Sequence, residues 1–242
     1  MNSYKLINFK KVKSTNLELK KILKKKKSIN NLCISAEHQT AGYGRRNSKW
    51  FSFKGNVHLS IFVIPKCSLN RVNQLSFLTS LSIGQTLKKM KKNINFYYKW
   101  PNDIILEKKK VGGVLIETSS LKNKINWVII GIGINIKKYP NLNQNFYQAT
   151  SFKNQKIKID KKKFIDIFLI NFFKNFNNWE KKGFNFIKKK WLFNIYKENN
   201  TIKIKDKNKI IIGKFPSLTS DGSLKLNINK KIKLFSFGDQ II

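Results

Sequence analysis

The spacing of apolar residues changes after Tyr196, and this change limits the folds open to the chain. Before that point, segments with helical spacing alternate with segments of strand-like alternation. After it, short runs such as "TIKIK", "KIIIGKF" and "KIKLF" follow one another with turn residues between them. The pattern predicts an α+β protein, with a mixed β-sheet backed by helices over residues 1–196 and a small C-terminal β-barrel over residues 197–242.

Several segments of the first part are predicted individually. A helix is expected to begin near Asn16, where Thr15 and Glu18 have the spacing of a capping box. A second helix is expected through the seventies and eighties, and a third follows apolar positions from Phe164 to Trp179. Strands are expected at "LCISA", "VHLSIFV", "NFYYKW" and "WVIIGIGINI", and "IILEKKKVGGVLIE" predicts a hairpin with a basic tip.

The formal net charge of +38 raises nucleic-acid binding as one possible function. The lysines, however, are dispersed in short runs, and they accompany Asn and Ile, residues whose codons can be written with A and T alone. An AT-biased genome would give this composition without a nucleic-acid partner. We therefore expect no specific DNA binding, and a basic nucleic-acid-binding module stays an alternative interpretation.

Cysteine and histidine positions argue against a disulfide scaffold and against a metal site. Cys33 and Cys67 lie far apart and are expected in or near the core. His38 and His58 have no Cys or carboxylate cluster at ligand spacing, so no metal ligands are predicted. The N-terminus lacks the apolar block of a signal peptide, and "FIDIFLINFF" is too short to span a membrane. We expect a cytoplasmic protein with no membrane partner.

Two of the chain's three arginines, Arg45 and Arg46, lie in one glycine-rich loop, "AGYGRR". Gly42 and Gly44 allow the backbone to approach an anion closely, and Arg45 supplies a planar charged group suited to phosphate or carboxylate. A solvated turn with incidental charge is the alternative for so short a motif.

Three further motifs place polar residues or glycines beside predicted strands. In "KWPND", Pro101 favours an extended Trp100, and Asn102 and Asp103 favour a turn. In "KVGGVLIE", Lys110 precedes two glycines that leave room for a ligand beside its ammonium group. The motif "GIGIN" lacks the third glycine of a dinucleotide-binding loop and falls inside a strand, so it is weak evidence for such a site.

In this order, "STN", "AEHQTAGYGRRNSKWFS", "KWPNDIILEKKKVGGVLIE" and "IIGIGINI" resemble the biotin protein ligase family across its catalytic domain. "GKFPSLTSDGSLKLN" resembles the family's small C-terminal β-barrel. The resemblance implies that biotin and MgATP give biotinyl-AMP and pyrophosphate, and that biotin then passes to one lysine of a biotin carboxyl carrier protein, the acetyl-CoA carboxylase subunit. Lipoate ligases and octanoyltransferases share this fold and are the alternative within the superfamily, but the order of the motifs favours biotin.

The resemblance also implies roles for individual residues. Biotin would contact Ser14, Thr15, Asn16, Gln39, Tyr43, Gly44, Arg45 and Lys110. ATP and the adenylate would contact Trp50, Asn102 and Asn135. The catalytic residues would be Arg45, Lys110 and Asp103. Of these, Lys110 would contact the reacting carboxylate and α-phosphate, and Asp103 would orient the acceptor lysine. The expected small molecules are ATP, Mg²⁺ and biotin.

Two departures from the family pattern lead to further expectations. Many members have Arg at the position of Tyr43, so we expect this loop to hold the adenylate less tightly than an arginine-containing loop. Some members also carry an N-terminal helix-turn-helix that represses transcription. Because "STN" begins at Ser14, the chain is expected to lack that domain and to act only as a ligase.

Overall fold

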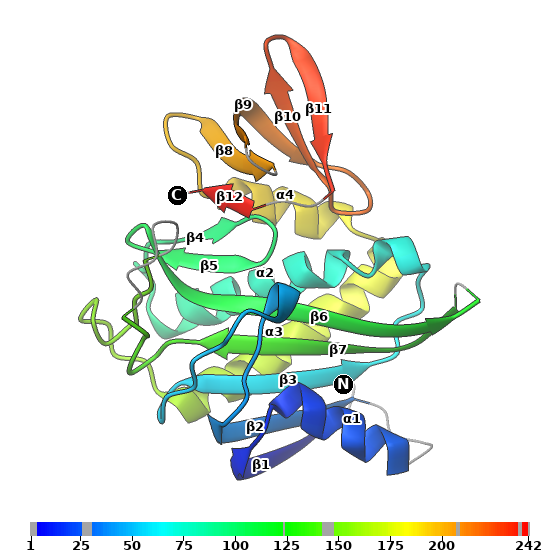
Figure 1. Ribbon diagram of the computed structural model, residues 1–242, viewed down its shortest axis with the longest axis vertical. Coiled ribbons are helices and arrows are strands. Elements are labelled where there is room, and N and C mark those ends of the chain that lie inside the picture. Colours follow the sequence, from blue (N-terminus) through cyan, green and yellow to red (C-terminus); the bar gives the residue numbers. More distant parts are fainter. Residues whose placement is uncertain are drawn as a thin grey trace.

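The computed structural model describes residues 4–25, 31–122, 124–141, 148–206, 209–236 and 239–241. Two β-sheets organise these residues (Figure 1). The larger sheet has seven strands in the order β1-β2-β3-β7-β6-β5-β4, and the smaller has five in the order β11-β10-β9-β8-β12. The predicted fold class is confirmed: a mixed sheet with helices is followed by a small curled antiparallel sheet, a half-barrel.

The strands of the large sheet are β1 (Lys5–Val12), β2 (Leu32–Gln39), β3 (Val57–Val63), β4 (Phe96–Lys99), β5 (Asp103–Leu106), β6 (Lys109–Leu121) and β7 (Lys124–Ile134). β1 and β2 are parallel, and the other neighbouring pairs are antiparallel. The predicted hairpin is formed by β5 and β6. Its two turn residues, Glu107 and Lys108, have φ values of 48° and 56°, as a type I′ turn requires. β1 was not predicted, because lysines interrupt its apolar alternation.

The helices lie on both faces of the large sheet. They are α1 (Thr15–Lys25), α2 (Gln74–Met90), α3 (Lys161–Lys182) and α4 (Asn185–Phe193), with short 3₁₀ turns η1 (Arg45–Asn47) and η2 (Leu69–Arg71). α2 and α3 pack together behind the sheet, and α1 covers β2 and β3 from the other side (Figure 1). α4 was not predicted, because three consecutive lysines interrupt its apolar face, of which only Ile187 and Trp191 are buried.

The first turn of α1 confirms the predicted helix but not its predicted cap. The helix begins at Thr15, beside the predicted start near Asn16, and the Glu18 N–H donates to the Ser14 carbonyl as part of the helix. The capping box is therefore wrong. The Thr15 hydroxyl donates to Gln39 on β2, and the Glu18 carboxylate pairs with Lys21. Leu19 holds the helix on the sheet, since it is fully buried among apolar residues of β2, β3 and β7.

The most apolar segment, "FIDIFLINFF", lies in α3. Phe164, Phe168, Phe172 and Phe176 are buried at four-residue spacing, and this gives the helix one core-facing stripe. Asp166 lies outside the stripe and pairs with Lys162. Among the helices in the described part of the chain, none is both long and apolar enough to cross a membrane.

The small sheet consists of β8 (Thr201–Asp206), β9 (Lys209–Leu218), β10 (Leu224–Ile228), β11 (Lys231–Phe235) and β12 (Asp239–Ile241). Its neighbouring strands are antiparallel. Buried residues such as Ile204 and Leu224 belong to the same apolar cluster as α2 and α3. The predicted boundary after residue 196 falls between α4 and β8, and the division into domains 1–196 and 197–242 stays a proposal.

Candidate active site

A pocket of about 420 Å³ lies on the face of the large sheet opposite α2 and α3. Segment 40–56, which includes η1, crosses in front of β6 and β7 there (Figure 1). The volume is in the range of roughly 300–1,000 Å³ that is usual for small-molecule sites. The pocket is lined by all twelve residues to which the sequence assigned a site role: Ser14, Thr15, Asn16, Gln39, Tyr43, Gly44, Arg45, Trp50, Asn102, Asp103, Lys110 and Asn135.

The alternation of side chains along β7 explains why the pocket lies here. Isoleucines at every second position of β7 pack into the core with α2 and α3, so Gly131 and Gly133 lie on the opposite face. A Cβ atom on Gly131 would lie 2.8 Å from Asn16 Oδ1, and one on Gly133 would lie 2.3 Å from Trp50 Cζ2. The two glycines therefore allow Asn16 and Trp50 to lie directly on the sheet.

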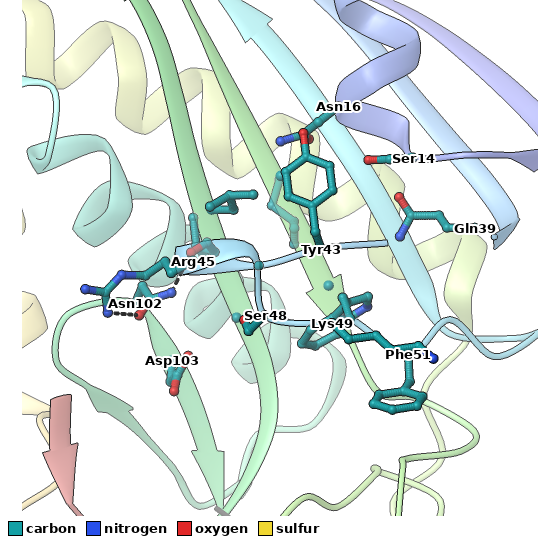
Figure 2. A pocket seen from close by; sticks show the side chains of 18 of the residues that line it. Ser14, Asn16, Gln39, Tyr43, Arg45, Ser48, Lys49, Phe51, Asn102 and Asp103 are labelled. Atoms are coloured by element: carbon teal, nitrogen blue, oxygen red, sulfur yellow. Dashed lines mark hydrogen bonds between the residues drawn. The ribbon is translucent and has the colours of Figure 1, made fainter. Parts of the chain in front are cut away.

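One end of the pocket is a hydrogen-bonded polar cluster at the start of α1. The Thr15 N–H and hydroxyl both donate to Gln39 Oε1, at 2.8 and 3.1 Å. Ser60 on β3 is hydrogen-bonded to Thr15 Oγ1, at 2.6 Å, and to Asn16 Oδ1. Figure 2 shows Ser14, Asn16 and Gln39 grouped around this end of the pocket. The cluster presents a ligand with both donors and acceptors in a fixed arrangement.

Glu117 on β6 connects the polar cluster to the glycine-rich loop. Its carboxylate accepts hydrogen bonds from Asn16 Nδ2 at 2.6 Å and from the Tyr43 hydroxyl at 2.9 Å, and it pairs with Lys20 Nζ at 2.7 Å. Tyr43 extends from the loop toward Asn16 in Figure 2. Burial and the adjacent Glu117 carboxylate raise the pKa of Tyr43, so the hydroxyl stays protonated and acts as the donor.

The glycine-rich loop is folded back on itself by backbone hydrogen bonds. The Gly44 N–H donates to the Ser48 carbonyl at 2.7 Å, and the Ser48 N–H donates to the Arg45 carbonyl at 3.0 Å. The Arg45 guanidinium then donates to Asn102 Oδ1 at 3.4 Å, the dashed contact in Figure 2. The loop therefore spans the pocket from Tyr43 at the polar end to Arg45 beside the start of β5.

The end of the pocket near Arg45 contains a carboxylate between two ammonium groups. Asp103 Oδ1 lies 2.7 Å from Lys110 Nζ, and Asp103 Oδ2 lies 3.3 Å from Lys99 Nζ. Burial alone would raise the pKa of Asp103, but the ammonium groups of Lys110 and Lys99 outweigh it and hold that pKa below its usual range. Asp103 is therefore ionised at neutral pH, and only Lys110 of the two lysines lines the pocket.

Trp50 and Asn135 define a third part of the pocket. Asn135 Nδ2 donates to the Thr150 carbonyl at 3.2 Å, and Asn135 Oδ1 accepts from Asn56 at 3.3 Å. The Trp50 indole lies against Gly133, and its Nε1 atom is buried with no hydrogen-bond partner in the described part of the chain. A flat ligand ring could stack on Trp50 where it lines the pocket.

Comparison with known proteins assigns the chain to a family. The family described as "Biotin/lipoate A/B protein ligase family" matches residues 8–135, a range that contains all twelve of these residues. The chain belongs to this family.

Members with similar sequences include the bifunctional ligase/repressor BirA of Bacillus subtilis, which is 32% identical over 204 residues. That match covers 83% of this chain and 62% of the relative, so the chain spans about three fifths of the relative's length. The biotin–[acetyl-CoA-carboxylase] ligase of Paracoccus denitrificans is 32% identical over 108 residues, or 44% of this chain and 45% of the relative. The solved structure of biotin protein ligase from Aquifex aeolicus in complex with biotin and ATP is 29% identical, with a TM-score of 0.80 and 97% of each chain covered.

Among the residues to which the sequence assigned no site role, Glu117, Ser60 and Lys99 bind side chains of this site directly. Glu117 and Ser60 are polar residues at alternating positions of strands, a signal that was present but was not used. Lys99 is the first residue of the motif "KWPND", but the motif alone assigned it no role. Whether the twelve predicted residues have the predicted roles stays a proposal, as does weaker retention of the adenylate by the Tyr43 loop.

Proposed function

We propose that this chain is an ATP-dependent biotin protein ligase that forms biotinyl-AMP and transfers biotin to one lysine of a biotin carboxyl carrier protein. The observation that carries the proposal is the polar cluster at one end of a pocket whose other end is cationic. A ureido ring has one carbonyl acceptor and two N–H donors. It can therefore pair with the hydroxyl and amide groups of Ser14, Thr15, Asn16 and Gln39, which line that end.

The same cluster argues against lipoate and octanoate. A dithiolane ring or an alkyl chain offers no hydrogen-bond donors or acceptors comparable to a ureido ring. Placed against this cluster, it would displace water from the remaining donor and acceptor positions of these groups without replacing the hydrogen bonds that the water makes, which is unfavourable. A site built around Thr15, Asn16 and Gln39 should therefore reject both acids.

In the first step, a biotin carboxylate oxygen attacks the α-phosphorus of ATP. The bond from that phosphorus to the pyrophosphate oxygen breaks, and pyrophosphate leaves with the bonding electrons. Because both reactants are anionic, the step needs fixed positive charge where negative charge develops. Lys110 and Arg45 line the pocket and would supply it, and the Gly44 loop would cover the product. Asn102 would hold Arg45, since it already accepts a hydrogen bond from the guanidinium.

The adenine would bind in the third part of the pocket. Trp50 offers the part of its indole ring that lines the pocket. Asn135 is hydrogen-bonded to Asn56 and to the Thr150 carbonyl, so its amide is held in one orientation beside that ring. Stacking on Trp50 and hydrogen bonding at Asn135 would then hold the adenylate.

In the second step, the acceptor lysine must first lose a proton to solvent, since its ordinary pKa is about 10.4. Its nitrogen then attacks the acyl carbon, the bond from that carbon to the phosphate oxygen breaks, and AMP leaves with the bonding electrons. A second proton leaves the nitrogen as the amide forms. We assign Asp103 the role of orienting this amine. Its lowered pKa makes it a weak proton acceptor but keeps it available as a charged hydrogen-bond acceptor.

We infer that Mg²⁺ enters as part of the substrate MgATP. In the part of the chain that the structure describes, no three His, Cys, Asp or Glu side chains form a group able to hold a metal ion. The pocket carboxylate, Asp103, is already paired with two lysines. The donor set therefore does not fit a protein-built magnesium site, whereas Mg²⁺ readily keeps its waters and binds substrate phosphates.

A pyrophosphate-release assay tests the proposal. Biotin, lipoate and octanoate are compared under MgATP, and we expect release with biotin alone. The second step is followed with labelled biotin and a carrier protein, and the matched control is the same carrier with its acceptor lysine replaced by arginine. Equal turnover of lipoate and biotin would contradict the assignment of substrate.

The high positive charge makes nucleic-acid binding a second function to test. A duplex of arbitrary sequence is titrated with salt, and we expect binding to disappear by physiological ionic strength without sequence preference, as non-specific phosphate contacts do. Sequence-selective binding that persists in that salt would instead support a nucleic-acid-binding module.

A further inference from the structure

Lys99 is an exception among the basic residues of this chain. Lys and Arg together number 50, yet Lys99 is the only one with a buried side chain in the described ranges, at 1% exposure. Among the acidic residues whose side chains the structure describes, the only buried one is its partner, Asp103. Codon bias can place lysines on the surface, but it does not account for a lysine enclosed beside a site carboxylate.

The two lysines that share Asp103 hold different oxygen atoms. Lys99, at the end of β4, lies against Oδ2, and Lys110, on β6, lies against Oδ1. Lys110 has 28% of its side chain exposed and lines the pocket, and Lys99 is not among the lining residues. One lysine can therefore turn toward a ligand while the other stays in place.

We propose that Lys99 is a positioning residue, the permanent counter-ion that holds Asp103 when Lys110 moves to the reacting carboxylate and phosphate. The inference rests on the proposed function. Two ammonium groups beside one carboxylate leave one positive charge in excess, so an arriving anion draws Lys110 away. Without Lys99, that movement would leave a buried carboxylate unpaired, which is strongly unfavourable. With Lys99 in place, Oδ1 becomes free to accept a hydrogen bond from the acceptor amine.

Among the side chains that the structure describes, few other charged groups lie around Asp103. Arg45 reaches the neighbouring Asn102 from the glycine-rich loop, at 3.4 Å. The contact from α2 to this turn is neutral, from the Ser76 hydroxyl to the Pro101 carbonyl. The contact from β12 is also neutral, with Gln240 accepting from the Trp100 N–H. Once Lys110 has turned to the adenylate, Lys99 is the charge that lies directly against Asp103.

The test measures the second step alone. Purified biotinyl-AMP and carrier protein are supplied to the wild type, Lys99→Met and Lys99→Arg, and the single-turnover transfer rate is recorded from about pH 5 to pH 8. Each variant's rate is divided by the wild-type rate at the same pH, which cancels the ionisation of the acceptor amine. Loss of a counter-ion within contact distance raises a carboxyl pKa by about 1–3 units. The Lys99→Met ratio should therefore fall as pH falls, and the Lys99→Arg ratio should stay constant.

A constant Lys99→Met ratio across this range would overturn the inference, because a merely structural defect slows transfer equally at every pH. If Lys99→Met does not fold, Asp103→Asn is compared with the double variant Lys99→Met/Asp103→Asn, in which neither charge is left unpaired. Because Lys99 acts through Asp103, the single variant Asp103→Asn and the double variant should transfer biotin at equal rates. Unequal rates would also overturn the inference. A wild type that releases no pyrophosphate from biotin and ATP would instead contradict the proposed function.

Discussion

The Tyr43 hydroxyl donates a 2.9 Å hydrogen bond to Glu117 Oε2 and so joins the glycine-rich loop to β6 across the polar end of the pocket. The same carboxylate holds Asn16 and pairs with Lys20, so the contact also ties the loop to α1. A neutral donor to a carboxylate therefore stands at a position where the family resemblance led us to expect arginine.

Tyr43→Phe removes this contact and keeps the ring. A hydrogen bond to a charged group contributes about 1.5 kcal/mol, so we expect labelled biotinyl-AMP to dissociate about tenfold faster from the variant in a chase with unlabelled adenylate. Tyr97→Phe, on β4 and away from the pocket, is the matched control and should release the adenylate at the wild-type rate. An unchanged rate in Tyr43→Phe would mean that the contact does not hold the loop closed.

Lys110→Ala tests the charge that the first step requires. Loss of one preorganised donor to a developing negative charge costs about a hundredfold or more in rate, so pyrophosphate release should fall by that factor. The melting temperature should change little, because Lys99 still neutralises Asp103. Lys109→Ala, on the same strand, is the control for loss of a lysine. Wild-type pyrophosphate release by Lys110→Ala would show that its assigned role is wrong.

Two glycines of β7 allow a paired test of the polar end of the pocket and of its third part, at Trp50. A Cβ at Gly133 would lie 2.3 Å from the Trp50 ring, and one at Gly131 would lie 2.8 Å from Asn16 Oδ1. Gly133→Ala should therefore raise KM for ATP more than KM for biotin, and Gly131→Ala should do the reverse. Each variant is the control for the other in steady-state pyrophosphate release. Equal effects on both substrates would indicate general damage to the sheet.

The elements that sequence predicted well are those in which local pattern and tertiary structure agree. The hairpin at Glu107 and Lys108 and the core-facing stripe of α3 are examples, since each depends on residues close together in the chain. β1 and α4 were missed because lysines interrupt their apolar patterns, and long lysine side chains can lie at the edge of a buried surface without disturbing it.

Site residues that lie within a short sequence motif were predicted. Residues that contact the site from distant parts of the sequence were missed. Local motifs place Gly44, Arg45 and Lys110, and these residues line one pocket. Glu117 binds Asn16 across 101 positions of sequence, and no local pattern specifies such a contact. The burial of Lys99 likewise follows from how β4 packs in the folded protein. Contacts of this kind arise from the topology of the sheet, so a single sequence does not reveal them.

Stability should depend on pH through His58. Burial lowers the pKa of His58 to about 4, and the ordinary value is about 6.5. Between these values the unfolded chain binds a proton that the folded protein does not, so the free energy of unfolding falls as pH falls through this window. Between pH 7 and about pH 4.5, the free energy of unfolding should decrease by about 2–3 kcal/mol more in the wild type than in His58→Gln, as measured by urea unfolding. His38→Gln, at an exposed histidine, should behave as the wild type. If the free energy of unfolding decreases equally in the wild type and in His58→Gln, His58 does not stay neutral in the folded protein.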